Sequence, residues 1–475
     1  MVAEQNRSVI RYLVLAMSLV VDTPVASSEQ IVGVRSPALV LAALGISSFM
    51  VTLDVTALNV ALPSIGEMFG LPLSALQWVA SAYTLVFASL LLTAGASSDR
   101  WGARPVFLGA LTFFTLASAA CGLANSATEL VAARAVQGLG AAAILPSSMA
   151  LLTNAFPLAA HRARAVAIWS GISATALVAG PLIGGFLVQT LGWRSIFFVN
   201  VPVCLLVLTI AFTCAGRPKT HRRALDPAGQ LLAASALFTI TFSAIEARQY
   251  GWTSPAIAGA LGIGLIAALL FLAVEHHRHD PMLPLSLFRS RTFAASVAAA
   301  FLYNLSYYGA LFVLPVTLQA QGASPLLAGV MLIPMTLSTA VLATASGWIV
   351  SYIGARALAA LGMLAGALGA ATLVSFGLTS WSMTVGGLFV GIGGGTLPLI
   401  VAAALSSVPS ARVGVGSGVL NAARQSGGAM GIAILGALLQ GVPLNAGLAL
   451  TAIAAVFLTG AIVTFLFMRE VTAAK

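Results

Sequence analysis

The sequence predicts an all-α integral membrane protein, built as two pseudo-symmetric six-helix bundles with two additional transmembrane helices between them. Three observations lead to this fold class. Of the 475 residues, 59% are hydrophobic and only 7% are charged, whereas about 25% are charged in an average soluble chain. Apolar runs of about 20 residues, long enough to cross a bilayer as a helix, recur along the chain. Several short motifs also occur twice at one fixed offset.

Fourteen apolar runs follow one another from Pro37 onward, separated by short polar loops. An even number of spans places both ends of the chain on one side of the membrane. Eighteen of the 22 Lys and Arg then lie in segments on that side; Arg194 and Arg248 lie in outer loops, and Arg134 and Arg424 lie in spans. Since basic loops stay in the cytoplasm, both termini are predicted to be cytoplasmic. The predicted spans are 38–62, 74–97, 105–124, 127–153, 163–189, 195–215, 227–247, 254–275, 293–317, 325–351, 355–376, 380–406, 413–440 and 444–468.

The first 37 residues are predicted to be a cytoplasmic segment. Their apolar stretch, 10–21, is too short to span a membrane and has no clear small-residue cleavage site. An interfacial segment and a mis-set start codon are both compatible with this pattern.

An internal repeat appears at an offset of 252 residues. It carries Leu62-Pro63 onto Leu314-Pro315, Gly102-Ala-Arg104 onto Gly354-Ala-Arg356, and Pro146 onto Pro398. Repeats of this kind place a substrate pathway between the halves near the bilayer midplane, with one half rocking against the other. The predicted division of the chain is an N-terminal segment 1–37, a first bundle 38–215, a linker with two inserted helices 216–292, a second bundle 293–468 and a cytoplasmic tail 469–475.

Asp54 is the only carboxylate that this division leaves deep inside a span. A charge there costs about 2.5–3.5 kcal/mol on insertion scales, so a functional role is the default hypothesis. The alternative is a structural group that hydrogen-bonds one helix to another. Arg134, in span four, also needs a partner, and Asp54 is the first candidate and Gln137 the second. In the second half, Ser306 stands at the position equivalent to Asp54.

A carboxyl group in this setting can couple to protons. Burial without a partner favours its neutral form, whereas a nearby arginine favours its ionised form. A conformational change that alters the balance would therefore bind or release one proton. No cofactor is expected, and a proton gradient is the predicted energy source.

The loop between spans two and three reads Gly95-Ala-Ser-Ser-Asp99-Arg100-Trp-Gly102-Ala-Arg104. It resembles the signature loop of the major facilitator superfamily, with Ser97 and Ser98 in place of small apolar residues and Ala103 in place of a basic one. The glycines permit a tight turn, and Asp99 could pair across the interface between the halves or cap a helix. The resemblance implies a conformational latch formed by Gly95, Asp99, Arg100, Gly102 and Arg104.

Span five contains Gly171-Ile-Ser-Ala-Thr-Ala-Leu-Val-Ala-Gly180-Pro181-Leu-Ile-Gly184-Gly185. It is similar to the motif that distinguishes antiporters from symporters in that superfamily. The small residues let helices approach closely, and Pro181 removes one helical hydrogen bond. A generic packing face is the alternative interpretation.

The resemblance narrows further at three segments: Leu53 to Pro63, Arg134 to Gly140, and Asn421 to Gly428. Together with the inserted pair of spans, they resemble the fourteen-span drug:proton antiporters, and among these the methylenomycin-resistance type of exporter. Arg424 could be a substrate contact or an internal strut. The candidate residues for the substrate pathway are Asn59, Trp78, Tyr83, Gln137, Trp169, Asn304, Tyr307, Tyr308, Asn421, Arg424 and Gln425.

The expected function is proton-coupled export of small amphipathic drugs or antibiotics by alternating access, by a monomer in a bacterial cytoplasmic membrane. Export or uptake of an endogenous metabolite or natural product is the alternative. An intramembrane enzyme needs a second carboxylate, a histidine cluster or a nucleophile with its base at membrane depth, and the spans offer none. The net charge of +10 lies in loops facing the anionic inner leaflet and requires no nucleic acid. The run His276-His277-Arg278-His279 is interpreted as a solvated loop rather than a metal site.

Overall fold

The chain folds into long helices, and the residues that are described contain no strand. The computed structural model describes residues 36–214, 226–278, 281, 283–409, 412–441 and 443–469. The predicted segment 1–37 lies almost entirely outside this range, as does most of the tail 469–475. The helices of the first part are α2 (Pro37–Phe69), α3 (Leu73–Trp101), α4 (Ala103–Leu123), α5 (Ala127–Ala155), α6 (Ala159–Leu191), α7 (Ser195–Phe198) and α8 (Asn200–Cys214).

The remaining helices follow the same order as the predicted spans. They are α9 (Pro227–Tyr250), α10 (Pro255–His277), the short η1 (Leu285–Arg289), α11 (Arg291–Ala320), α12 (Pro325–Met331), α13 (Ile333–Ile353), α14 (Ala355–Phe376), α15 (Ser380–Gly394), α16 (Leu397–Ser406), α17 (Val413–Leu439) and α18 (Ala446–Phe467). Three predicted spans are thus each divided into two helices, α7–α8, α12–α13 and α15–α16. Pro202, Pro334 and Pro398 each lie within the first three residues after a division, where a missing backbone N–H disrupts the helix least.

Within the described residues, thirteen segments are long and apolar enough to cross a membrane. The remaining predicted span, 413–440 and the thirteenth in chain order, coincides with α17, which is long enough but is not among the thirteen segments. Asn421, Arg424 and Gln425 lower the hydropathy of this helix. The protein is therefore a multi-pass helical membrane protein, and α17 lies mostly in its interior.

The repeat seen in the sequence is also visible in the backbone. Gly102 joins α3 to α4 and Gly354 joins α13 to α14, with φ angles of 92° and 78°. Positive φ is easily reached only by glycine, which explains why both copies of the motif keep it. The arginine two residues later stacks on a phenylalanine in each case: Arg104 lies 5.5 Å from the ring of Phe212, and Arg356 4.7 Å from that of Phe465.

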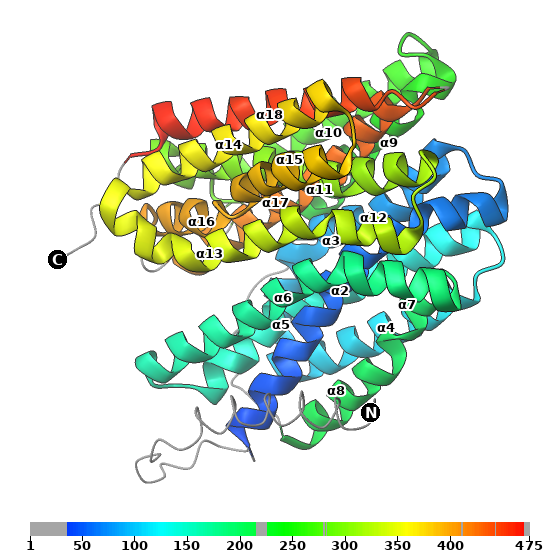
Figure 1. Ribbon diagram of the computed structural model, residues 1–475. Helices are drawn as coiled ribbons and strands as arrows, with labels where there is room; N and C mark the ends of the chain where they lie inside the picture. Colours follow the sequence, from blue (N-terminus) through cyan, green and yellow to red (C-terminus); the bar gives the residue numbers. More distant parts are fainter. Residues whose placement is uncertain are drawn as a thin grey trace.

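Corresponding helices pack in corresponding pairs. In the first part α2 packs on α6 and α5 on both α3 and α4, while in the second part α11 packs on α17 and α15 on both α13 and α14. The two parts meet where α6 contacts α12 and where α17 contacts α3. In Figure 1, α4 to α8 lie in the lower part of the molecule and α13 to α18 in the upper part.

The inserted helices α9 and α10 pack on each other, and α9 alone of the two lies firmly against the rest. On the α3 side its contacts are polar: Gln230 donates to the Ser89 carbonyl at 2.5 Å, and the Trp78 indole donates to Glu246 at 2.7 Å. On the α17 side they are apolar, with Ala244 and Ile245 against Ala433. Helix α9 thus covers the line where α3 meets α17.

Candidate functional site

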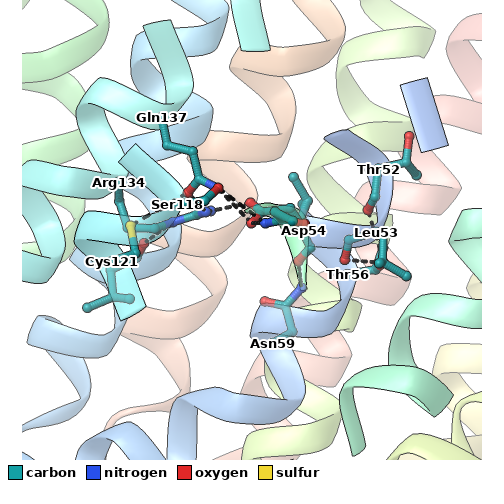
Figure 2. Close-up of polar contacts among 12 residues, drawn as sticks. Thr52, Leu53, Asp54, Thr56, Asn59, Ser118, Cys121, Arg134 and Gln137 are labelled. Carbon is teal, nitrogen blue, oxygen red and sulfur yellow. Dashed lines mark hydrogen bonds and ion pairs between the residues drawn. The ribbon is translucent and has the colours of Figure 1, made fainter. Parts of the chain in front are cut away.

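The centre of the first group of helices holds a buried ion pair. Asp54, in the middle of α2, accepts from Arg134 of α5 at 2.5 Å, and both side chains are 1% exposed. The other carboxylate oxygen accepts from Gln137 at 2.8 Å and from Asn200 at 3.0 Å. Figure 2 shows Arg134 and Gln137 reaching toward Asp54 from the same side. The predicted pairing of Asp54 with Arg134 and Gln137 is therefore present in the structure.

Helix geometry brings these donors together. Arg134 and Gln137 are three residues apart on α5 and so share one face, and the Arg134 guanidinium also donates to the Gln137 carbonyl oxygen at 2.5 Å. Ser118 of α4 accepts from Gln137 at 2.8 Å and from Asn200 at 3.3 Å. Four helices, α2, α4, α5 and α8, thus contribute to one network in which the two formal charges cancel.

Aromatic rings complete the surroundings of the arginine. Its guanidinium carbon lies 4.4 Å from the ring centre of Tyr83 and 5.9 Å from that of Phe197, distances at which a cation is attracted to a ring face. Close helix contact makes this approach possible, because a Cβ on Gly138 would stand 2.4 Å from the Tyr83 carbonyl oxygen. A β-carbon on Gly140 would likewise collide with α4. The glycines that follow Arg134 therefore hold α5 against both neighbours.

The other candidate residues for the substrate pathway lie in separate regions of the structure. Tyr307 lies 5.6 Å from Tyr303 and 6.4 Å from Tyr308 between ring centres, and Tyr308 also packs against the core of the first group of helices. Arg424 donates to Asn421 at 2.9 Å on α17. These rings and Arg424 form a second polar region, in the second half of the chain.

The remaining candidates make local contacts. Asn59 and Asn304 each donate to the carbonyl four residues earlier on their own helix. Trp78 faces α9, near Phe238 and Phe242. Trp169 is partly buried, with an indole N–H that has no partner among the described residues, and Gln425 is partly exposed.

The predicted latch residues lie at the end of α3, away from the ion pair. Asp99 and Arg100 are in the last turn of α3 and Gly102 forms the turn. Arg104, at the start of α4, donates to the Phe212 carbonyl at 2.5 Å and so ties α4 to α8. Gly95 faces Pro146 of α5, with 4.0 Å between the Pro146 Cβ and a Cβ placed on the glycine.

The predicted antiporter motif is an interface on two sides of α6. A β-carbon on Gly180 or Gly184 would collide with Thr56 or Ala57 of α2, and one on Gly185 would stand 2.6 Å from the Pro325 carbonyl of α12. The Pro181 carbonyl is approached in the same way by Gly329 of α12. Gly171, the first glycine of the motif, has open space around it. Helix α6 thus remains continuous through Pro181 and packs against both halves.

We expect Gly184→Ala to destabilise the protein and Gly171→Ala to leave it unchanged or slightly more stable. The new methyl group at Gly184 would overlap Ala57, and overpacking costs about 1–3 kcal/mol. At Gly171 nothing is displaced, and alanine favours the helix by up to about 1 kcal/mol. Thermal unfolding of the two purified variants in the same detergent measures the difference. Equal melting temperatures would contradict the interpretation of Gly184 as a contact that must stay small.

Residues Ser118, Asn200 and Cys121 of the network, and Glu246 beside Trp78, were not among the predicted site residues. Polar residues such as Ser118 are frequent in these spans and mostly bond to their own helix, so nothing marks one of them in the sequence. Asn200 had a signal, because it lies two residues before Pro202 and hence at a helix start. Glu246 lies one residue from the end of the predicted span 227–247, a place where a carboxylate is not exceptional.

The fold and this site define a class of protein: a multi-pass helical membrane protein with a charge pair sealed inside one half and further polar residues between its helices. The comparison with known families is specific. The model of the Major Facilitator Superfamily matches residues 44–432 and, a second time, 297–475, and the chain belongs to this family.

Curated relatives cover most of the chain. The multidrug resistance protein Stp of Mycobacterium tuberculosis is 36% identical over 409 residues, which is 85% of this chain and 76% of that protein. The methylenomycin A resistance protein of Streptomyces coelicolor is also 36% identical, over 84% of this chain and 85% of its own. The cephamycin export protein CmcT of Amycolatopsis lactamdurans is 36% identical, over 82% of each chain. The relatives therefore include proteins of drug resistance and antibiotic export.

Solved structures agree at the level of the fold. The crystal structure of the peptide transporter POT in complex with sulfate superimposes with a TM-score of 0.69 over 90% of this chain and 93% of that one, at 15% sequence identity. At such identity the match shows a shared arrangement of helices.

Proposed function

We propose that this protein exports small amphipathic drugs or antibiotics across the cytoplasmic membrane in exchange for protons. The observation that carries the proposal is the sealed pair of Asp54 and Arg134, whose charges are 1% exposed and bonded to each other. A membrane protein keeps such a pair at a cost, since a hydrophobic replacement is often as stable. A requirement that Asp54 gain and lose a proton would explain why the protein keeps the pair despite this cost in free energy.

The geometry suggests how a proton would be taken up. Arg134 occupies one carboxylate oxygen, while Gln137 and Asn200 donate to the other. If α5 moves relative to α2, Asp54 loses its counter-ion, and a carboxyl group left without one inside the membrane binds a proton. Restoring the pair releases that proton. Asp54 alone would couple one proton to each cycle.

We further propose alternating access between two six-helix bundles, residues 38–215 and 293–468, with α9 and α10 as an inserted pair in a total of fourteen spans. Hydrogen bonds between the two groups gather at the end where α6, α11 and α17 finish. Gln77 bridges to the Ala433 carbonyl at 2.7 Å, Gln319 to the Val60 carbonyl at 2.9 Å, and the Leu326 N–H donates to Gln189 at 3.2 Å. A conformation closed at this end is one of the two states that alternating access requires.

Export of an antibiotic made by the same cell is a second candidate. It is favoured by relatives named as export proteins for cephamycin and for tetracenomycin C, the latter from Streptomyces glaucescens and 35% identical over 85% of this chain. The mechanism would be the same and only the solute would differ.

The function is tested with purified protein in lipid vesicles. A compound panel drawn from both candidates is offered under an imposed pH gradient, and movement of compound and of protons is recorded together. Compound accumulation that appears only with the gradient, and collapses when a protonophore removes it, supports exchange. Accumulation that ignores the gradient would reject proton coupling.

The loop from Gly95 to Arg104 is proposed to act as a latch between conformations. Its turn is fixed by the positive φ of Gly102, and the Arg104 bond to α8 makes α4 and α8 move as one. Because Gly418 of α17 lies close to Leu92, near this end of α3, the turn is next to the boundary with the other group.

The proposed orientation places both termini and the 217–226 loop in the cytoplasm. Reporter fusions at Lys475 and within 217–226 are expected to give a cytoplasmic signal, because the basic segments oppose translocation. A fusion in the loop 251–254, between α9 and α10, serves as the control and should report the outside. An outside signal at either of the first two positions would reject the orientation.

A further inference from the structure

Arg424 is a charged residue inside the helical core that the ion pair does not explain. It lies eleven residues into the 27-residue helix α17, and its side chain is partly exposed. Among the described residues it forms one hydrogen bond, which it donates to the neutral Asn421 on the same helix at 2.9 Å. Its buried Nε has no partner among the described residues. A guanidinium stays charged at any physiological pH, so a full positive charge has no counter-ion within the part of the chain that the structure describes.

Among the described residues, no carboxylate forms an ion pair with Arg424. Asp54 is neutralised by Arg134, and Asp226 by Arg278. Glu246 accepts from Trp78 near the far end of α9, and Asp99 lies in the last turn of α3. The position equivalent to Asp54 in the second half is Ser306, whose buried hydroxyl also lacks a partner among the described residues. The second half therefore has a membrane arginine without its own carboxylate.

The neighbours of Arg424 are suited to an amphipathic ligand. One turn further along α17, a Cβ on Gly428 would stand 3.4 Å from the Tyr308 ring, so this ring lies beside the same part of the helix. Tyr308 packs against the hydrophobic cluster that contains Tyr83. The Tyr83 ring faces the Arg134 guanidinium, and its hydroxyl has no partner in the described chain. Aromatic faces beside a charge offer one surface for an apolar body and one group for a polar end.

Helix α6, the equivalent of α17 in the first half, also has an unpartnered hydrogen-bond donor at the matching level. Trp169 of α6 stands 252 residues before Asn421, and its indole N–H is buried without a partner in the described residues. An indole and a guanidinium donate hydrogen bonds and accept none. The unpartnered groups at this level of α6 and α17 are thus hydrogen-bond donors.

We propose that the exported substrate carries a negative charge, such as a carboxylate or sulfonate on an apolar body, and that Arg424 binds this charge. The proposal rests on the function proposed above and names its substrate class. A cation would face an uncompensated positive charge here, whereas an anion supplies the missing counter-ion. Tyr308, which is partly exposed, would contact the apolar body.

Binding is tested with three probes that share a pyrene body and differ in charge: 1-pyrenesulfonate, 1-pyrenemethanol and 1-pyrenebutyltrimethylammonium. We expect the wild type to bind the sulfonate at least tenfold more tightly than the trimethylammonium compound. Arg424→Gln should weaken sulfonate binding about tenfold and change pyrenemethanol binding less than twofold, and Arg424→Lys should keep part of the preference. Arg356→Gln, which removes an arginine stacked on Phe465, is the matched control and should behave as the wild type.

Two outcomes would overturn the proposal. One is trimethylammonium binding as tight as sulfonate binding in the wild type. The other is an Arg424→Gln variant, folded by its melting curve, in which all three affinities fall by the same factor, because that pattern belongs to a structural strut.

Charge movement gives a second and independent test. Outward movement of an anion and inward movement of protons transfer charge in the same direction, whatever the number of protons. Efflux of loaded 1-pyrenesulfonate from vesicles should therefore accelerate under an inside-negative potential set with valinomycin and potassium. For one proton per anion, 59 mV would raise the attainable gradient about a hundredfold, tenfold for each charge. Potential-independent efflux of the sulfonate would reject anion export.

These results separate the two proposals. If any of the panel compounds is driven by a pH gradient but the sulfonate is not preferred, proton-coupled export stands and the anionic substrate fails. If the sulfonate is preferred in binding but no compound responds to the gradient, the binding site stands and proton coupling fails.

Discussion

Asp54→Asn is expected to abolish uphill export while leaving the protein folded and able to bind its substrate. The amide has nearly the volume of the carboxyl group and resembles its protonated form, so one of the two coupling states is made permanent. Arg134 keeps the Gln137 carbonyl oxygen and the Tyr83 ring as partners. In vesicles with a pH gradient of one unit, one proton per substrate can sustain about a tenfold accumulation. The Asp54→Asn variant should show no gradient-driven accumulation of substrate.

A matched control is available in Glu246→Gln. It makes the same exchange of carboxylate for amide in a span, at a residue bonded to Trp78 rather than to an arginine. Gradient-driven accumulation should survive in this variant. If Asp54→Asn moved protons against substrate at the wild-type ratio, Asp54 would be a structural residue and the coupling mechanism would be wrong.

Arg134→Ala is expected to have the largest effect on stability. It removes the counter-ion of a carboxylate that is 1% exposed and leaves a cavity beside Tyr83 and Phe197. Breaking a buried pair from one side costs about 3–5 kcal/mol, which is a large part of the total stability of most proteins. The yield of folded protein and its melting temperature in detergent measure the loss.

The double variant Arg134→Ala with Asp54→Asn tests the reason for that loss. If the uncompensated carboxylate causes it, removing the charge should recover part of the stability even though a second residue has been changed. The cavity remains in both variants, so recovery reports charge alone. A double variant less stable than Arg134→Ala by the full cost of Asp54→Asn would mean that the two residues do not interact energetically.

Much of the fold follows from hydropathy and from the repeat. The apolar runs locate the helices, and the repeated Gly-Ala-Arg motif marks the two equivalent turns at Gly102 and Gly354, because only glycine tolerates their backbone angles. The division of three spans into helix pairs was not predicted, since hydropathy is blind to a change of direction within an apolar run. Pro202, Pro334 and Pro398 were the available signals.

The charged residues of the site could be predicted from the sequence, whereas its neutral residues could be predicted less well. A lone carboxylate and a lone arginine in the spans of one half have little choice of partner, and Asp54 and Arg134 are indeed bonded. Asn200 and Ser118 complete the network, but a neutral polar residue costs too little in a membrane to indicate a special role. Which of the pathway candidates face one another depends on helix rotation, which sequence periodicity in a nearly uniform apolar span does not define.

Because of the position of α9, lipid has different access to the two boundaries between the halves. At the boundary of α6 with α12 and α13, Leu182 and Phe186 are exposed, so bilayer chains would contact it directly. The boundary of α3 with α17 is covered by α9, which is bonded to α3 by Gln230 and Glu246 and packs on α17 through apolar residues. A solute dissolved in the membrane would therefore reach the boundary on the α6 side without passing α9, whereas α9 covers the other boundary. Toward α17, the helix that carries Arg424, the contacts of α9 are apolar.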